Sequence, residues 1–170
     1  MAPMNGVLGV TTYEVSVALH VMAAIVVFGP TFVFPLIQMT AEKASPRHLP
    51  FAWEIIRKID HGLVTPGVLL VLGTGIYQWI DGGWDLGRDQ WLSIGFGLLV
   101  VLYVLSFFTF HPAERKAIAA SEEMVAAAGP EGTVELSSEY QEATRVVNIA
   151  GPIYAILTLF IVYLMVVKPF

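Results

Sequence analysis

A histidine lies within a long apolar segment of this sequence, and an ionisable side chain at such a position commonly has a functional role. His20 is in a stretch that begins at Val15 and contains no Asp, Glu, Lys or Arg. Along a helix it would lie about 8 Å below the start of that stretch. A neutral imidazole there could be an axial ligand of haem iron, or it could hydrogen-bond to a hydroxyl such as that of Ser16 or Thr158. The residue pattern leaves both interpretations open.

Glycines in two other apolar segments are predicted to lie at the depth of His20. Counting about 8 Å inward from the outer ends of those segments reaches the level of Gly73, Gly75, Gly95 and Gly97. Missing side chains opposite an imidazole would leave room for a flat prosthetic group, but small residues also let membrane helices pack closely. We therefore take His20 and the four glycines as candidate cofactor-binding residues. The candidate cofactor is haem b, with His20 as the ligand of the haem iron; the alternative is that no cofactor is bound.

A second group of ionisable residues is predicted to meet at the opposite ends of two spans. His61 begins the second span and His111 ends the third, close to Asp60, Glu114 and Arg57. Two histidines and a carboxylate could hold a metal ion. The alternative is that they pair with lipid headgroups or neighbouring charges. We expect the alternative, so that alanine at either histidine would leave any bound metal or cofactor unchanged.

Several classes of function are excluded or disfavoured by the composition. The chain contains no cysteine, which excludes disulfides, iron–sulfur clusters and thiolate metal sites. Its net charge of −5 and the lack of a basic block give no support for nucleic-acid binding. No P-loop, Ser-His-Asp or HExxH pattern indicates a hydrolase or NTPase. No catalytic residue can be identified, and the absence of charged residues from the spans disfavours a proton-coupled transporter.

Four charge-free stretches cover more than half of the 170 residues and predict the fold. Each is about as long as the roughly 20 residues that a helix needs to cross a bilayer, and in lipid such segments must be helical. The chain is 56% hydrophobic and 14% charged, with a mean hydropathy of +0.70. We predict an all-α integral membrane four-helix bundle with short amphipathic helices, forming a single transmembrane domain over 1–170. The predicted spans are 13–38, 62–80, 91–111 and 147–167.

The distribution of basic residues predicts the orientation in the membrane. The loops after the first and third spans hold seven basic residues, whereas the opposite side holds only Arg88 and Lys168. The seven are Lys43, Arg47, Arg57, Lys58, Arg115, Lys116 and Arg145. We therefore expect a multi-pass protein of the cell inner membrane, with both termini outside the cytoplasm.

Prolines predict where the helices bend, begin and end. Pro30 and Pro35 predict a kink in the inner half of the first span. Pro50 is suited to the start of a short amphipathic helix, with Trp53 at the membrane interface. The third span is expected to end near His111, because the residue before a proline is biased away from helix.

The polar segment 114–145 is predicted to be a solvated hairpin on the cytoplasmic side. A surface helix should occupy its first half and stop at Gly129. Ser138 and Gln141 form a capping-box pattern that predicts the start of the last helix. Within that helix, Asn148 is expected to hydrogen-bond across to another helix.

The first span resembles the first helix of a superfamily of small bacterial membrane proteins. The superfamily includes the HemJ-type protoporphyrinogen oxidases, the copper-resistance protein D family and predicted membrane proteins of unknown function. The resemblance is carried by Leu19-His20, followed by small apolar residues and Phe28-Gly29. The run Leu72–Tyr77 is similar to the second-helix pattern, and Val166–Phe170 is similar to the endings of several members.

For the oxidase branch the resemblance implies a b-type haem held by His20. The oxidases usually open the third helix with Trp-Leu-His-x-Lys, whereas Trp91-Leu92 is followed here by Ser93 and Ile94. The sequence therefore most resembles the uncharacterised branch, which brings no established activity.

Two functions of different kinds are compatible with these patterns. The first is a membrane protein that binds haem or another porphyrin through His20. The second is a non-enzymatic accessory subunit or small permease-like protein without a cofactor. The expected partners are the lipid bilayer and either further copies of the chain or a larger membrane complex.

Overall fold

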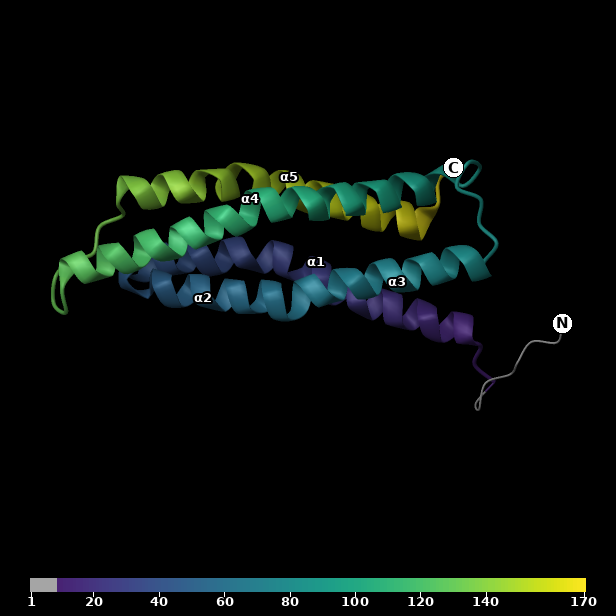
Figure 1. The fold of residues 1–170 in the computed structure, drawn as a ribbon, viewed down its shortest axis with the longest axis horizontal. Coiled ribbons are helices and arrows are strands. Elements are labelled where there is room, and N and C mark those ends of the chain that lie inside the picture. The colour runs from purple at the N-terminus through teal and green to yellow at the C-terminus, as the bar shows by residue number, and fades with distance from the viewer. Residues whose placement is uncertain (1–8) are drawn as a thin grey trace.

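The computed structural model describes residues 9–170, and in this part of the chain every regular element is helical (Figure 1). Four helical segments, Thr12–Ala44, Pro46–Asp81, Gln90–Ala128 and Ser138–Val167, are long and apolar enough to cross a membrane. The prediction of an all-α membrane four-helix bundle is thus confirmed. The elements are α1 (Thr12–Ala44), η1 (Pro46–His48), α2 (Leu49–Ile59), η2 (Asp60–Val64), α3 (Thr65–Asp81), α4 (Gln90–Ala128) and α5 (Ser138–Val167).

The surface of the spans is apolar, as lipid exposure requires. Large aliphatic side chains such as Ile25, Leu69 and Ile156 are each more than 60% exposed. A soluble monomer rarely exposes apolar surface on this scale. The apolar side chains that the bundle does not bury are therefore suited to contact with lipid tails.

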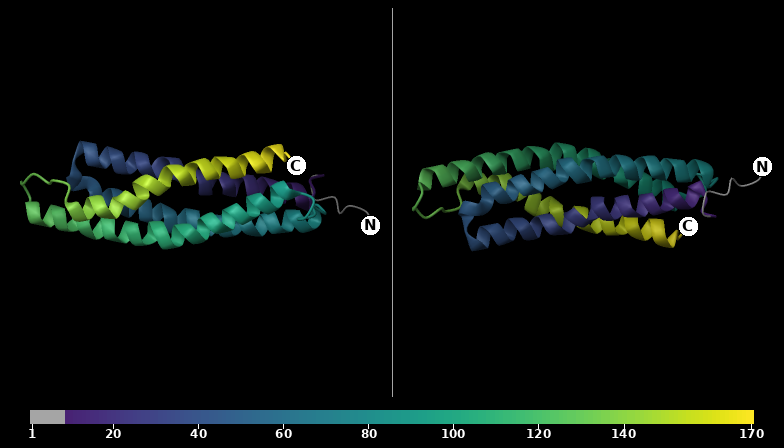
Figure 2. Two further views of the ribbon diagram at one scale, coloured as in Figure 1. Left: turned by 90° about the horizontal axis from the view of Figure 1, so that it is seen from above. Right: turned by 90° about the horizontal axis from the view of Figure 1, so that it is seen from below.

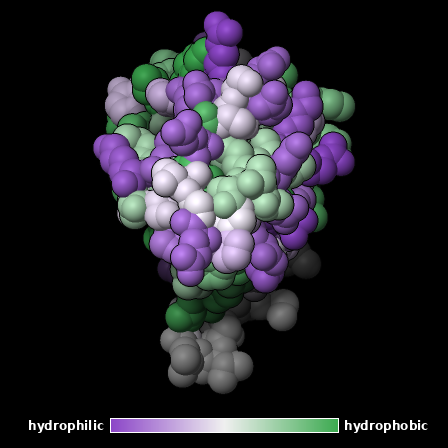
Figure 3. Space-filling view, turned by 90° about the vertical axis from the view of Figure 1, so that its left-hand side faces the viewer, coloured by the Kyte–Doolittle hydropathy of each residue, from purple (hydrophilic) through white to green (hydrophobic). Residues whose placement is uncertain are grey.

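The helices form two pairs that cross along the length of the molecule (Figures 1 and 2). α1 packs against α3 and α4 packs against α5, while α2 lies against both α1 and α4. The start of α1, the end of α5 and the turn at 82–89 lie at one end, here named the termini end. The other end carries η1, α2 and the connection 129–137, and is named the basic end. Hydrophilic side chains cover much of the basic end (Figure 3).

The basic end has a well-packed core of its own. Leu49 and Ala117 are completely buried, and Trp53 is 3% exposed. The indole N–H of Trp53 donates to the Tyr140 hydroxyl over 3.2 Å. Trp53 is therefore buried within the protein and not at the membrane interface. The predicted helical hairpin is present, since its first helix ends at Ala128 and its second begins at Ser138. Both halves extend the long helices, and one face of each packs with α2 around this core, so that only the outer faces are solvated.

α4 continues through Pro112 for four more turns and ends at Ala128. The expected end near His111 is therefore wrong. A proline removes one helical hydrogen bond, but Ala113, Ala117 and Met124 bury one side of the following turns. This packing maintains the helix where the local preference disfavours it.

The remaining helix boundaries follow local sequence signals. α1 begins at a Thr11 capping box, in which Glu14 accepts from the Thr11 backbone N–H over 2.8 Å. α1 continues through Pro30 and Pro35 as one helix to Ala44, six residues beyond the predicted end of the span. α5 begins at Ser138 as predicted, but its cap is Ser137, whose hydroxyl accepts from the Tyr140 N–H.

Candidate functional site

His20 lies at the contact between α1 and α3. Its Nδ1 atom is 2.9 Å from the Thr74 hydroxyl, and that hydroxyl donates to the Leu70 carbonyl over 2.6 Å. When the Thr74 proton is used on α3 itself, the hydroxyl oxygen accepts from His20. This arrangement corresponds to the imidazole tautomer that is protonated on Nδ1 and has a lone pair on Nε2. The hydrogen-bond partner is Thr74 rather than the expected Ser16 or Thr158.

Gly75 gives His20 its space. A Cβ atom at Gly75 would lie 3.3 Å from Cε1 of the imidazole, closer than most such contacts. Gly95 makes room for a different side chain. The methyl group of Met165 occupies the space that a Cβ atom at Gly95 would need. Gly73 and Gly97 have no neighbouring atom within 4 Å of a Cβ position, and Gly73 is exposed. The structure thus brings Gly75 to His20 but does not bring the other three glycines against the imidazole.

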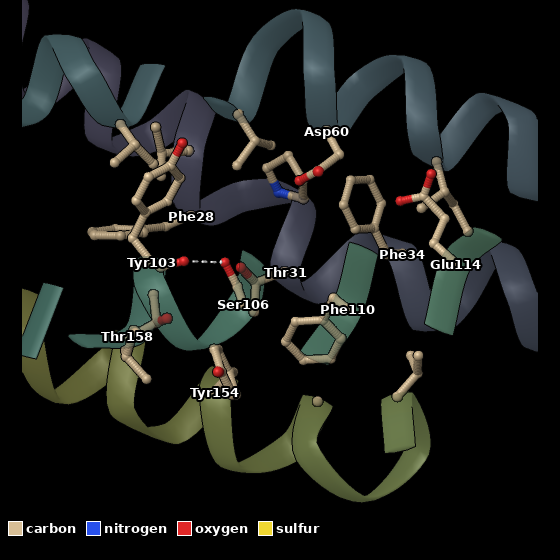
Figure 4. A pocket seen from close by; sticks show the side chains of 18 of the residues that line it. Phe28, Thr31, Phe34, Asp60, Tyr103, Ser106, Phe110, Glu114, Tyr154 and Thr158 are labelled. Atoms are coloured by element: carbon tan, nitrogen blue, oxygen red, sulfur yellow. Dashed lines mark hydrogen bonds between the residues drawn. The ribbon is translucent and has the colours of Figure 1, made fainter. Parts of the chain in front are cut away.

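A cavity of about 190 Å³ lies between the four spans (Figure 4). On α1 its lining residues run from Val27 to Gln38, on the basic-end side of His20. Its wall is mostly aromatic and aliphatic and includes Phe28, Phe34, Phe110 and Leu102. Pro30 and Pro35 of α1 also line it. The cavity could hold many water molecules, each of which needs only about 10–15 Å³ in this measure. Concave, mostly apolar spaces with a few polar groups are typical ligand sites.

The hydroxyl of Tyr154 in the cavity wall is buried without a partner. It is the one buried side-chain polar atom in residues 9–170 that forms no hydrogen bond. The ring of Tyr154 is fixed by an edge contact with Phe110, with centroids 4.7 Å apart. By contrast, the Ser106 hydroxyl beside it donates to the Tyr103 carbonyl of its own helix over 2.7 Å. The phenol oxygen thus lacks a hydrogen-bond partner in a residue that lines the cavity, and a ligand would reach it only after a small shift of the wall.

Charged and imidazole groups close the cavity at the basic end. Nε2 of His111 is 3.0 Å from the Asp60 carboxylate, and both side chains are 21% exposed. Glu114, one turn further along α4, is 6% exposed and also lines the cavity. Burial, together with the negative charge of Asp60, raises the pKa of the Glu114 carboxyl to about 7. The sequence had indicated that these residues are near one another, but not that they face a cavity.

A buried polar chain lies beside this end of the cavity. The Tyr140 hydroxyl donates to Glu42 over 2.9 Å, and Gln38 donates to Glu42 over 2.9 Å and to Asn148 over 3.4 Å. The predicted cross-helix bond of Asn148 is therefore confirmed. Burial raises the pKa of the Tyr140 phenol above its ordinary value. Together with the indole of Trp53, this chain joins α1, α2 and α5 below the cavity.

The central cavity was not predicted from the sequence. The available signal was the occurrence of hydroxyl side chains, Thr31, Ser106, Tyr154 and Thr158, in the charge-free parts of three helices. A hydroxyl inside a span can bond to its own helix and then needs no other partner. Only the helix arrangement distinguishes Ser106, which does so, from Tyr154, which does not.

The chain was compared with known families, curated proteins and solved structures. Residues 14–169 match the model of a family described as a predicted integral membrane protein (DUF2269). No curated protein and no solved structure matches the chain. The family description gives a membrane location and no activity, so the function has to be inferred from the geometry.

Proposed function

The chain belongs to the DUF2269 family of predicted integral membrane proteins, and we propose that it binds one small, mostly apolar molecule in its central cavity. The proposal is carried by the Tyr154 hydroxyl, which is buried in the cavity wall and has no partner there. A buried polar group without a hydrogen bond costs about 1–3 kcal/mol. A ligand with a hydrogen-bonding group would remove this cost.

The chemistry of the wall indicates the class of ligand. Phe28, Phe34 and Phe110 favour a hydrophobic body, since aromatic side chains have large contact areas. Although the cavity has room for water, the aromatic part of its wall offers too few polar partners, because a buried water needs two to four of them. A ligand with an apolar body and one polar group next to Tyr154 would satisfy both parts of the wall.

A pair of leucine substitutions tests this proposal. Ser106→Leu would fill part of the cavity, whereas Thr109→Leu is the matched control: Thr109 is on the same helix and its hydroxyl also bonds to that helix, over 2.8 Å to the Leu105 carbonyl. We expect native mass spectrometry of the wild type and of Thr109→Leu to show about one bound molecule per chain. Ser106→Leu should lack it. Equal amounts of bound molecule in the two variants would contradict the proposal.

A second candidate function, binding of haem b or another porphyrin through His20, is favoured by one specific observation. When Nδ1 donates to Thr74, the proton is on Nδ1 and Nε2 is free. This is the usual arrangement of a metal-bound histidine, whose second nitrogen is held by a hydrogen-bonding partner. Haem bound there would supply a redox-active iron. The resemblance of the first span to a superfamily with haem-binding members adds support.

This second candidate has its own test. His20 does not line the central cavity, so haem binding and cavity binding can be separated. We expect protein made in haem-replete cells to show a Soret band that is lost in His20→Ala and retained in Ser106→Leu. The absence of a Soret band from the wild type would contradict haem binding. His20 would then be a packing residue, as in a cofactor-free accessory subunit or permease-like protein.

A further inference from the structure

Three side chains that commonly bind metals meet where η2 faces α4, at the basic end of the bundle. Asp60, His61 and His111 each offer one ligand atom, and these three atoms lie within 4.8 Å of one another. The ring centroids of His61 and His111 are 4.9 Å apart. In a metal site the ligand atoms surround one ion at about 2 Å each. The observed separation of the three atoms fits this arrangement after small side-chain rotations.

The backbone beneath two of these residues is unusual. Asp60–Val64 forms a π-helical turn, in which the N–H of Thr65 bonds to the Asp60 carbonyl. Such turns are rare and occur frequently at functional sites. Here the wide turn presents both Asp60 and His61 to His111. The hydrogen bond between His111 and Asp60 would by itself join η2 to α4. It does not account for His61, which forms no hydrogen bond in the part of the chain that the structure describes.

A fourth potential ligand lies next to the three. Glu114 follows His111 by three residues on α4, so the two side chains lie on the same face of the helix. The Glu114 carboxylate lines both the central cavity and a smaller one that also includes His61 and His111. Arg57 and Arg115 line the smaller cavity as well and compete with a cation for the carboxylates. The two imidazoles bind metals in their neutral form, so they favour a metal over an arginine.

We propose that Asp60, His61 and His111 bind a divalent transition-metal ion, with Glu114 as a neighbouring carboxylate in the same cavity walls. Two imidazoles with carboxylates suit zinc or ferrous iron, whereas magnesium and calcium prefer oxygen ligands alone. The ion would lie at the basic end of the central cavity, since Asp60, His111 and Glu114 belong to its wall. This inference requires no ligand in that cavity, and it reverses the expectation that the two histidines pair only with headgroups or neighbouring charges.

Zinc binding to the purified full-length chain tests the site. The protein should carry no histidine tag, be stripped with EDTA in detergent, and be titrated with Zn²⁺ by calorimetry. We expect one Zn²⁺ per chain. His61→Gln and His111→Gln should each weaken binding at least about tenfold, since loss even of outer partners of metal ligands costs 10–100-fold. The amide of glutamine at 111 can take the position of the imidazole Nε2 atom and donate to Asp60, so this variant preserves the link between η2 and α4.

Two control variants separate this site from other histidines. His48→Gln lies in η1, outside the cluster, and His20→Gln lies in the α1–α3 contact. Both should bind Zn²⁺ as the wild type does, and all variants should keep the helical circular dichroism signal. A wild type that binds less than about a tenth of an equivalent would overturn the proposal. So would equal weakening in His48→Gln and His61→Gln.

Discussion

Single polar atoms in the interior of this bundle differ in whether they have a hydrogen-bond partner. The Tyr154 phenol is buried without a partner, whereas that of Tyr140 accepts from Trp53 and donates to Glu42. The two tyrosines therefore have the same side chain in opposite states of hydrogen-bond satisfaction. Since an unpaired buried donor is costly and a paired one is not, removal of the two hydroxyls should have opposite effects on stability.

Tyr154→Phe should stabilise the protein from which bound molecules have been extracted, by roughly 1 kcal/mol, because it removes an unpaired buried hydroxyl. Tyr140→Phe should destabilise it by about 1–3 kcal/mol, because Trp53 and Glu42 lose their common partner. Denaturant unfolding in a mild detergent, followed by circular dichroism, measures both. Destabilisation of the same size in both variants would show that Tyr154 already has a partner in the free protein.

His20 shows how far sequence reasoning reaches at the scale of one residue. It could be singled out because it is the one histidine deep in a span. Its partner Thr74 could not be predicted, since the choice among hydroxyls depends on which helices pair and in what register. The same holds for Gly75 and Gly95, whose free space is used by His20 and Met165. The count of residues from the ends of the spans predicted that the glycines lie at one depth. It could not predict which neighbouring helix each glycine faces.

At the scale of elements, the basic end depends on buried faces that extend the long helices beyond the apolar spans. In α4, Ala113, Ala117, Ala120 and Met124 recur at intervals of three and four residues and are buried. This spacing is typical of an amphipathic helix and was available in the sequence. The prediction gave more weight to Pro112, because the residue before a proline is biased away from helix, than to this amphipathic spacing. The structure shows that packing outweighs the proline.

The amphipathic helix α2 provides a quantitative test of this packing. Leu49→Ala should destabilise the protein by about 2–5 kcal/mol, because it leaves a cavity at a side chain that is completely buried. Phe51→Ala, on the same helix at a residue that is 67% exposed, should change stability by less than about 0.5 kcal/mol. Denaturant unfolding compares the two variants. Similar effects would indicate that α2 does not pack as described.

At the scale of the whole molecule, the bilayer accounts for what could be predicted best. Because lipid cannot satisfy backbone polar groups, four long apolar segments had to form four helices, and the structure confirms this. The cavity arises where side chains of the α1–α3 pair face those of the α4–α5 pair. This packing cannot be predicted from the sequence of any one helix. The orientation remains a proposal, which rests on the excess of basic residues at the end that carries α2.

Cysteine labelling tests the proposed orientation, and the absence of native cysteine makes it clean. Arg88→Cys lies in the turn at the termini end, and Glu131→Cys lies at the basic end; both positions are exposed. An impermeant thiol reagent added to intact cells should label position 88 and should label position 131 only after the membrane is permeabilised. The reverse pattern would show that the termini face the cytoplasm.

The central claim, that the cavity between the spans takes up an apolar molecule, can be tested with a small hydrocarbon diazirine in lipid vesicles. After irradiation, mass spectrometry of peptides locates the labelled residues. Lipid-facing Ile156 provides an internal control in every sample, because it is 66% exposed. In the wild type we expect label on Tyr103 and Tyr154 as well as on Ile156. In Ser106→Leu the label on the two tyrosines should disappear while that on Ile156 remains. Label confined to Ile156 and other lipid-facing residues in the wild type would contradict the claim.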